Sequence, residues 1–253
     1  MAMHYRLFLL DLDDTLLDFR ASERLSFERT LHGFGITQHA DSLFADYQAV
    51  NRQLWQELEG GRVDKEFLKV ERFRRVLGQH RIDIDPVAAS HAYLEWLPQT
   101  VVLVKGARAL CEALSAHGQI GIITNGIEQV QRRRIACSGL QDLIGFVATS
   151  EACGHAKPDE RFFDYTTRMA GAFVKRETVI IGDRLEADVL GGNRFGIDSC
   201  WFNPHGASNE SDALPTYEAA RLDSIHGLLG GGTVAVVDDA AGQGTLSRPF
   251  GVR

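Results

Sequence analysis

Two spacings of hydrophobic residues alternate along most of the chain. Short apolar runs, each long enough for one buried strand, occur at residues 5–10, 119–123, 145–149, 178–181 and 199–202. Between the later runs, apolar residues recur every three to four positions, which predicts helices at residues 107–117, 127–137, 158–170 and 186–195. Strands that alternate with helices form right-handed crossovers and a parallel sheet. The predicted fold class is therefore α/β, with a Rossmann-like parallel sheet as its core.

The stretch between the first and second predicted strands has helical spacing only. Its longest amphipathic pattern runs from near Asp41 to just before Gly60. Three more helices are predicted, at residues 25–34, 67–77 and 86–97. Gly35, Gly78 and Pro98 are expected to end them. We therefore predict a helical subdomain that is inserted into the sheet domain.

These patterns divide the chain into three parts. Residues 1–17 and 98–230 are expected to form the core, and residues 18–97 the helical insertion. The last part, residues 231–253, contains many glycines and alanines. A low-order tail is expected there, with one edge strand at residues 233–237.

Composition narrows the class of protein. With 44% hydrophobic and 24% charged residues, the chain of 253 residues has enough apolar sequence for a folded core. The net charge of −7 disfavours non-specific binding to nucleic acid or to anionic membranes. No apolar run approaches the roughly 20 residues of a membrane span, and the first run stops at Asp11 without the features of a secretory signal. We expect neither nucleic acid nor membrane as a partner, and either a monomer or a homodimer.

The cysteines give a further indication of the compartment. Cys111, Cys137, Cys153 and Cys200 lie far apart, with no C-x-x-C pair among them. A disulfide framework or a zinc site would need closer pairs. The expected compartment is the reducing cytoplasm.

Polar residues gather where the predicted strands end, or just beyond. The clusters are Asp11-Leu12-Asp13-Asp14-Thr15, Thr124-Asn125-Gly126, Lys157-Pro158 and Gly182-Asp183, the last followed by Asp188. Each cluster alone is more typical of a turn, a helix cap or a solvated lysine than of a site. The carboxyl ends of parallel strands, however, meet at one edge of a sheet, where ligands bind. Several such clusters in order therefore predict a single site.

The side chains in these clusters fit phosphoryl transfer with a divalent cation. A carboxylate such as Asp11 attacks phosphorus without prior deprotonation, and it forms an acyl phosphate that water then hydrolyses. Asp13 follows two residues later and can protonate the leaving alkoxide and then activate water. Asp11 and Asp183 offer the oxygen ligands that Mg²⁺ prefers, while Lys157 and Thr124 supply positive charge and hydrogen bonds to a phosphate.

All of these clusters, in this order, resemble the motifs of the haloacid-dehalogenase-like phosphatase superfamily. The resemblance implies an aspartyl-phosphate mechanism, with Asp11 as the nucleophile and Asp13 as the acid and base. It also implies a bound Mg²⁺, with Mn²⁺ or Co²⁺ as substitutes. The ion would be held by Asp11, Asp183 and the main-chain carbonyl of Asp13.

The same resemblance implies roles for residues around this centre. Phosphate contacts are expected from Thr124, Asn125 and Lys157. Asp188 would lie in the metal shell or orient the lysine, and Thr15 would lie behind the metal ligands. The helical insertion corresponds to the mobile cap of the superfamily, which closes over the substrate.

Other segments are similar to the bacterial pyrimidine 5′-nucleotidase branch of this superfamily. They are Phe44-Ala-Asp-Tyr-Gln-Ala-Val-Asn51 with Leu54-Trp55, Gly121-Ile-Ile-Thr-Asn-Gly126, Leu190-Gly-Gly192 and Cys200-Trp201-Phe202-Asn203. The similarity extends over residues 5–203, and it implies hydrolysis of nucleoside 5′-monophosphates, including deoxy and non-canonical pyrimidine ones. The chain departs from the branch in its tail after Leu229 and in Arg184-Leu185, which lies inside the fourth motif.

Several side chains outside the motifs need a separate interpretation. Phe44, Tyr47 and Trp55 share one helical stripe, which favours packing in a core over stacking on a base. Asn51 lies near that stripe and is our candidate in the insertion for a substrate contact. The run Arg132-Arg133-Arg134 is interpreted as a solvated helix face and not as a nucleic-acid site.

The sequence thus favours a Mg²⁺-dependent phosphomonoesterase, a 5′-nucleotidase acting on nucleotides such as dUMP, dTMP or UMP. One alternative is a sugar-phosphate or phosphoglycolate phosphatase with the same core, and another is a phosphomutase. A third is a non-catalytic regulatory protein that binds a phosphate ligand, since a fold does not fix function. A haloacid dehalogenase is disfavoured, because Asp13 supplies an acid and base that carbon–halogen displacement does not need.

Overall fold

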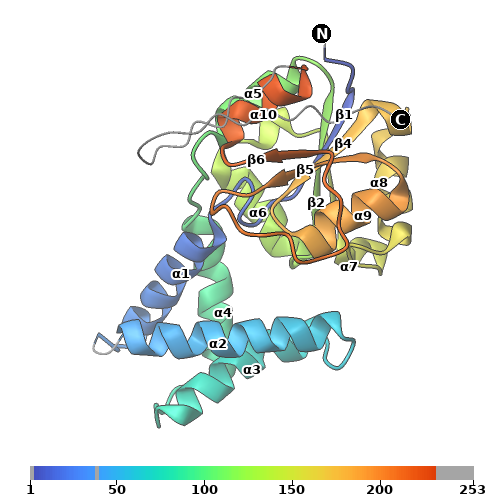
Figure 1. Ribbon diagram of the computed structural model, residues 1–253. Coiled ribbons are helices and arrows are strands. Elements are labelled where there is room, and N and C mark those ends of the chain that lie inside the picture. The colour runs from blue at the N-terminus through green and yellow to red at the C-terminus, as the bar shows by residue number, and fades with distance from the viewer. Residues whose placement is uncertain (1–2, 38–39, 232–253) are drawn as a thin grey trace, which may run out of the picture.

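The computed structural model describes residues 3–37 and 40–231 (Figure 1). Its centre is a 6-stranded sheet of parallel strands in the order β3-β2-β1-β4-β5-β6. The strands are β1 (Leu7–Leu10), β2 (Gln119–Thr124), β3 (Phe146–Thr149), β4 (Thr178–Gly182), β5 (Asp198–Phe202) and β6 (Tyr217–Ala219). The predicted α/β class and the parallel sheet are confirmed, and all strands except β6 coincide with predicted runs.

The position of β1 in the sheet determines where a ligand can bind. Leu10 pairs with Ile122 of β2 on one side and with Ile181 of β4 on the other. The chain builds β1, β2 and β3 outward in one direction and then crosses back to place β4 on the other side of β1. Open α/β sheets bind ligands at such a reversal, beyond the carboxyl ends of the strands. The polar clusters that follow β1, β2 and β4 therefore meet there.

Alternate residues of the strands face two different layers of helices. Phe8 and Leu10 pack in one apolar cluster with α5 (Ala107–Ser115) and α10 (Leu222–Leu229). Leu7 and Leu9 pack in another, with α8 (Glu160–Ala170) and α9 (Leu190–Phe195). Because both faces of the sheet are covered, each strand is a nearly continuous apolar run rather than an alternating one.

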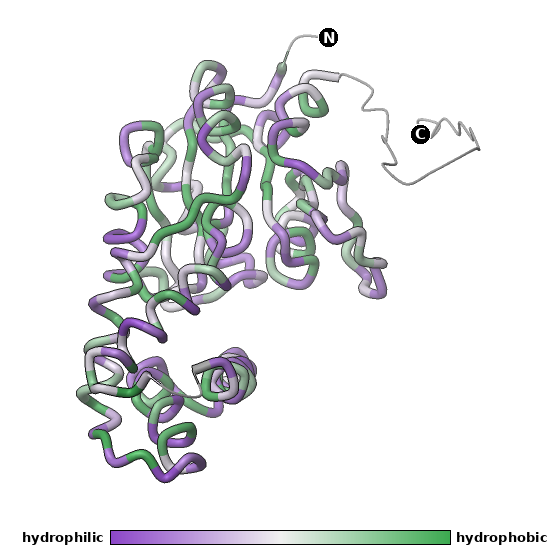
Figure 2. Tube along the Cα trace, turned by 90° about the vertical axis from the view of Figure 1, so that its left-hand side faces the viewer, coloured by the Kyte–Doolittle hydropathy of each residue, from purple (hydrophilic) through white to green (hydrophobic). Residues whose placement is uncertain are grey.

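The first four helices after β1 gather below the sheet in Figure 1, and we call them the helical block. They are α1 (Phe19–Gly33), α2 (Ala40–Glu59), α3 (Lys65–Gln79) and α4 (Pro86–Trp96). Asp18, Asp64 and Asp85 cap α1, α3 and α4 by accepting hydrogen bonds from main-chain N–H groups. The block has its own apolar core, in which Tyr47 and Phe73 are buried. Figure 2 shows hydrophilic and hydrophobic residues alternating along these helices, as amphipathic helices require.

The predicted helix ends are close to the observed ones, with informative differences. The helix α2 ends at Glu59, directly before Gly60, as predicted. The helix α3, in contrast, continues through Gly78 to Gln79. One glycine inside a helix costs only about 1 kcal/mol, which the burial of Leu77 in the core of the block outweighs. The helix α1 ends at Gly33, before the predicted Gly35.

Other parts of the described chain were not predicted, or differ in kind. Short elements have too few periodic positions to be recognised. They are α7 (Ser150–Cys153), η1 (Leu97–Gln99), η2 (Gln141–Leu143) and η3 (Lys175–Glu177), together with β6 and α10. The helix predicted at residues 186–195 is a π-helical turn, η4 (Leu185–Val189), followed by α9.

The expected tail strand at residues 233–237 lies outside the described residues. Over residues 3–37 and 40–231, no helix combines the length and the apolar character that a membrane span requires.

Candidate active site

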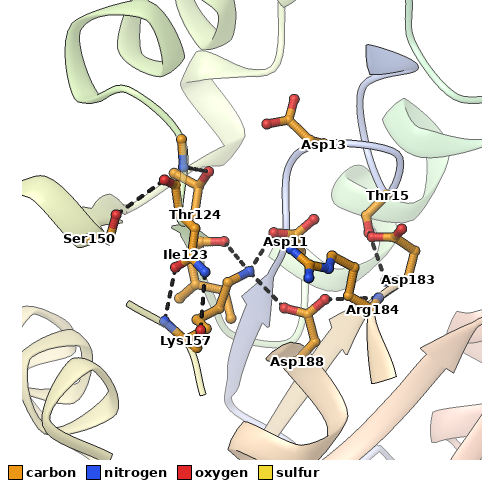
Figure 3. A network of polar contacts seen from close by, with 12 residues as sticks. Asp11, Asp13, Thr15, Ile123, Thr124, Ser150, Lys157, Asp183, Arg184 and Asp188 are labelled. Atoms are coloured by element: carbon orange, nitrogen blue, oxygen red, sulfur yellow. Dashed lines mark hydrogen bonds and ion pairs between the residues drawn. The ribbon is translucent and has the colours of Figure 1, made fainter. Parts of the chain in front are cut away.

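Asp11 and Lys157 form the centre of the site, at the carboxyl end of β1 (Figure 3). The Asp11 N–H donates to the main-chain oxygen of Ile181 at 2.9 Å, which extends the pairing of β1 with β4. The Lys157 ammonium donates to Asp11 Oδ1 at 2.5 Å, to Asp188 Oδ1 at 2.6 Å and to the main-chain oxygen of Ile123 at 3.0 Å. All three N–H groups of this buried lysine are therefore used, and its position is fixed.

Three aspartates surround the lysine closely enough to share an ion. Asp11, Asp183 and Asp188 each offer a carboxylate oxygen, and these oxygens lie within 4.8 Å of one another. The π-helical turn η4 brings Asp188 back against β4, where a Cβ on Gly182 would lie 2.3 Å from the carboxylate of Asp188. The glycine of the fourth motif is therefore required for this close approach.

The electrostatics of the cluster favour a bound cation. Burial raises the pKa of Asp11; Lys157 opposes the rise, and the negative charges of Asp188 and Asp183 add to it. Burial, with the charge of Asp188, raises the pKa of Asp183 to about 7. Burial acts to lower the pKa of Lys157, but Asp11 and Asp188 outweigh it and raise that pKa. Because the carboxylates outnumber the one ammonium, the oxygen donor set fits a divalent ion such as Mg²⁺.

Two side chains hold Asp183 in place from behind. The Thr15 hydroxyl donates to Asp183 Oδ1 at 3.1 Å and accepts from the Asp183 N–H at 3.1 Å. The indole N–H of Trp201 donates to the main-chain oxygen of Asp183 at 2.9 Å. The structure thus places Thr15 beside a predicted metal ligand, and it adds Trp201, whose contact with Asp183 the sequence does not indicate.

Asp13 points away from Asp11 and Lys157 in Figure 3. Its carboxylate accepts a hydrogen bond from Gln131 Nε2 at 2.6 Å and forms an ion pair with Arg134. Both partners lie on α6 (Glu128–Ser138), which follows β2. The helix that follows the second motif therefore holds the predicted acid and base in position.

The interpretation of Arg132-Arg133-Arg134 as a solvated face is wrong for one of its members. Arg134 is 0% exposed and contacts Asp13. Arg132 is exposed and pairs with Glu128, and Arg133 is partly exposed and pairs with Glu95. Arg134 lies one helical turn after Gln131, so both reach the same buried face. The spacing of these two residues was the signal in the sequence that could have revealed the contact.

Thr124 and Asn125 connect the second motif to the third. The Thr124 hydroxyl accepts from the Gly126 N–H at 3.0 Å and from Gln131 Nε2 at 2.9 Å. The Asn125 amide brackets the backbone of Lys157, because its Nδ2 donates to the Lys157 oxygen at 3.1 Å and its Oδ1 accepts from the Lys157 N–H at 2.9 Å. Asn125 therefore positions the lysine, and contacts of these residues with a phosphate stay a prediction.

Asn51 lies inside the helical block and not in the wall of the pocket beside Asp11. Its Nδ2 donates to Glu23 Oε1 at 2.8 Å, and its Oδ1 accepts from Arg72 Nη1 at 3.3 Å. Both ends of the amide are thus already bonded. Any influence of Asn51 on a substrate would pass through Arg72, which does line the pocket.

The aromatic stripe of α2 divides between packing and the pocket. Phe44 and Tyr47 are buried in the core of the block, as predicted. Trp55 is only partly buried and lines the pocket as well as packing against that core. The stripe therefore holds two core residues and one that a ligand can touch.

A pocket of about 220 Å³ joins the strand ends to the helical block. Polar residues of the motifs line one part of it: Asp11, Asp13, Thr124, Asn125, Lys157 and Asp183. Apolar side chains from the block and from its border with α6 line the rest: Phe19, Trp55, Leu94, Leu97, Ile127 and Val130. An ester with a polar head and an apolar remainder fits such a division.

A family model described as haloacid dehalogenase-like hydrolase matches residues 5–196, the stretch that carries all of these motifs. The chain belongs to the haloacid dehalogenase-like hydrolase family.

Individual relatives within the family are similar over most of the chain. Pyrimidine 5′-nucleotidase PynA from Streptococcus pneumoniae is 35% identical over 218 residues, which are 85% of this chain and 91% of PynA. Pyrimidine 5′-nucleotidase YjjG from Escherichia coli is 32% identical over 219 residues, which are 87% of this chain and 95% of YjjG. A magnesium-bound crystal structure of the HAD-hydrolase YfnB from Bacillus subtilis, described as revealing interdomain movement, matches with a TM-score of 0.81 and 32% identity. That match covers 89% of this chain and 98% of YfnB.

Proposed function

We propose that the protein is a Mg²⁺-dependent phosphomonoesterase that hydrolyses nucleoside 5′-monophosphates, with a preference for pyrimidine nucleotides such as dUMP, dTMP and UMP. The observation that carries the proposal is the single pocket in which Asp11 and Lys157 share a cavity with Trp55 and Leu94. A phosphate among the motif residues leaves the base against the apolar wall. The identity of 35% and 32% to two pyrimidine 5′-nucleotidases supports the same substrate class.

In the proposed reaction, a carboxylate oxygen of Asp11 forms a bond to phosphorus while the bond from phosphorus to the ester oxygen breaks. Asp13 gives its proton to the departing 5′-oxygen, so that the nucleoside leaves as a neutral alcohol. Asp13 then takes a proton from water, and the water oxygen bonds to phosphorus. The phosphorus–Asp11 bond breaks, which releases inorganic phosphate and restores the carboxylate.

The remaining residues of the motifs hold charge and position during these steps. Asp11, Asp183 and the main-chain carbonyl of Asp13 would hold Mg²⁺, which offsets the negative charge of the phosphate when bound. Lys157 keeps Asp11 oriented toward the pocket and provides a positive charge for the phosphate oxygens. Asp188 orients that lysine from behind.

We propose that residues 18–97 act as a cap on a core of residues 1–17 and 98–230. Two polar contacts support this division. Lys65 Nζ donates to the Gly126 oxygen at 2.7 Å and to Ser150 Oγ at 3.1 Å, and Arg184 pairs with Glu59 at 2.8 Å. Both contacts join the block to residues that directly follow β2, β3 or β4, beside the site. The unusual Arg184 of the fourth motif thus serves as a contact for the cap.

The reducing cytoplasm is proposed as the compartment. All four cysteines are free thiols, with Cys111 and Cys200 buried and Cys137 exposed. Burial raises the pKa of Cys111 and Cys200 to about 12, so both stay neutral and unreactive.

A screen of phosphate release tests the proposed function. The substrates are dUMP, dTMP, UMP, AMP, ribose 5-phosphate and phosphoglycolate, each with Mg²⁺ and with EDTA. We expect kcat/KM for the pyrimidine nucleotides to exceed that for the other substrates by about tenfold or more, and no release in EDTA. Preferred hydrolysis of ribose 5-phosphate or phosphoglycolate would favour the alternative phosphatases. Lack of release from every substrate would favour a binding protein.

A further inference from the structure

Two buried arginines line the same pocket, Arg72 from α3 and Arg134 from α6. Arg72 is 2% exposed and Arg134 is 0% exposed. Both lie near enough to Tyr93 for their charges to act on its hydroxyl. Because a guanidinium keeps its proton even when it is buried, two positive charges border a cavity that is lined by apolar side chains as well as by the polar residues of the motifs.

Three nitrogen atoms of this arginine pair have no hydrogen-bond partner among the described residues. They are Arg72 Nη2, Arg134 Nε and Arg134 Nη2. The other contacts of Arg72 are long, at 3.3 Å to Asn51 Oδ1 and 3.3 Å to the Lys69 oxygen. Arg134 Nη1, in contrast, is bonded to Gln131 Oε1 at 2.8 Å and also to Asp13. Since buried donors are nearly always paired in proteins, the free ones call for an acceptor that arrives with the ligand.

The guanidinium of Arg72 is held in place by stacking and not by strong hydrogen bonds. Its central carbon lies 4.6 Å from the ring centroid of Tyr93 and 5.8 Å from that of Tyr47. Stacking fixes the plane of the guanidinium and leaves its edge available for an acceptor in that plane. The position is preorganised, so that a ligand need not order this side chain when it binds.

The surroundings indicate which acceptor fits. Phe19, Trp55 and Leu94 line the same pocket as the arginine pair, and the first two of them offer flat aromatic rings. A planar ring that carries a carbonyl oxygen would place its faces against these walls and its oxygen on a guanidinium edge. Uracil, thymine and cytosine carry such an oxygen, whereas adenine and bare ribose do not.

We propose that Arg72 determines specificity for the leaving group, with its Nη2 donating a hydrogen bond to a ring carbonyl oxygen of a pyrimidine base. Arg134 is the second donor of this base site and also holds Asp13. The inference rests on the proposed nucleotidase function and identifies Arg72 as the side chain that recognises the base. Arg72 is the residue to test, because a change at Arg134 would also release Asp13.

The test compares dUMP with ribose 5-phosphate, which has the same 5′-ester and no base. Arg72→Met should lower kcat/KM for dUMP by about 10- to 100-fold, as expected for loss of a charged hydrogen bond, and for ribose 5-phosphate by less than about threefold. Arg72→Lys keeps the charge and the stem, and it should give an intermediate loss with dUMP. The matched control is Arg74→Met on the same helix, where Arg74 is exposed and ion-paired with Glu71. This control variant should leave kcat/KM unchanged for both substrates.

The outcomes separate this inference from the function on which it rests. If the wild type does not prefer dUMP to ribose 5-phosphate, the proposed function fails whatever Arg72 does. If the wild type prefers dUMP and both Arg72 variants keep that preference, only the inference is overturned. The same holds if kcat/KM falls equally for dUMP and for ribose 5-phosphate. A larger dependence on Arg72 with 3-phosphoglycerate would show that the acceptor is a carboxylate, and that also overturns it. If Arg72→Met does not fold, the comparison of dUMP with ribose 5-phosphate is made with Arg72→Lys alone.

Discussion

Two buried polar clusters lie beside the pocket, and they differ in their balance of charge. The strand-end cluster consists of Asp11, Asp183 and Asp188 around Lys157, and the block cluster consists of Glu23 and Asn51 around Arg72. The first has more carboxylates than cations, so its charge balance fits a bound divalent ion. The second has a guanidinium with a free N–H edge, so it needs an acceptor. A substrate with a phosphate at one end and a carbonyl at the other satisfies both.

The two clusters are also built by different means, which suggests different tasks. The strand-end cluster is placed by the register of neighbouring parallel strands, so its geometry is as rigid as the sheet. The block cluster is placed by side-chain packing among α1, α2 and α3. Chemistry common to a family fits the first arrangement, and a substrate preference particular to one branch fits the second.

Removal of the nucleophile from the strand-end cluster has the largest expected effect. Asp11→Asn leaves no carboxylate to attack phosphorus, and kcat for dUMP should fall by about 10⁴-fold or more. Steady-state phosphate release measures this, with circular dichroism to confirm folding. The matched control is Asp164→Asn on the exposed face of α8, which should keep full activity. Activity of Asp11→Asn within tenfold of the wild type would contradict the assignment.

Metal binding should depend on the next member of that cluster. Excess Mg²⁺ should raise the Tm of the wild type, since an ion that binds only the folded state stabilises it by about 2.7 kcal/mol at 100 times its Kd. Asp183→Asn replaces a charged carboxylate by a neutral amide, so it should abolish most of this rise, together with about 100-fold of kcat/KM. Thermal unfolding in Mg²⁺ and in EDTA checks the prediction. An undiminished Mg²⁺ shift in Asp183→Asn would contradict the ligand set.

The sequence made the strand-end cluster predictable, because each of its members sits in a short motif at the end of a strand or a few residues beyond it. The parallel register then brings motifs from distant parts of the chain together without further information. Asp11, Lys157 and Asp183 accordingly lie together, with Asp188 and Thr15 beside them. Their roles in catalysis and metal binding remain predictions.

The block cluster could not be predicted in this way. Arg72 has a helical position like that of many solvated arginines, and only the packing of α3 against α2 and α4 buries it. Asn51 was expected to face the substrate, yet its amide pairs with Glu23 and Arg72. Arg134 belongs to a run of arginines whose composition favours exposure to solvent, although Arg134 itself is buried. Side-chain burial across helices depends on tertiary packing, which periodicity alone does not fix.

The block cluster should give its own pH dependence of stability. Burial raises the pKa of Glu23 from 4.5 to about 7, so the folded protein holds this proton more tightly than the unfolded chain. Its contribution to stability is complete below pH 4.5 and is lost as the pH rises through 7, by about 3 kcal/mol at 1.36 kcal/mol per pKa unit. Glu23→Gln cannot titrate, so its free energy of unfolding should fall less between pH 5 and 7.5 than that of the wild type.

Urea unfolding at several pH values measures this difference in slope. Glu66→Gln on α3 is the matched control, because Glu66 is exposed and pairs with Lys69 at the surface. It should follow the wild-type slope. Identical slopes for the wild type and Glu23→Gln would show that Glu23 titrates alike in the folded and unfolded states.

The ion pair between the helical block and the segment that follows β4 should have the smallest effect. Glu59 pairs with Arg184 at 2.8 Å, but both side chains are more than one-third exposed, so the pair contributes less than about 1 kcal/mol. Glu59→Gln should raise KM for dUMP by about two- to threefold and leave the Tm nearly unchanged. Glu28→Gln breaks a comparable surface pair within the block and should not alter KM. Equal changes in KM for both variants would show that Glu59 does not act through the site.

The central claim is that one pocket joins a metal-dependent phosphate site to a site for a pyrimidine base. Its most direct test is the ratio of kcat/KM for dUMP to that for ribose 5-phosphate, measured with the full chain in Mg²⁺ and again in EDTA. The account predicts a ratio of about ten or more in Mg²⁺ and loss of both activities in EDTA. Hydrolysis of ribose 5-phosphate as efficient as that of dUMP, or activity that persists in EDTA, would contradict it.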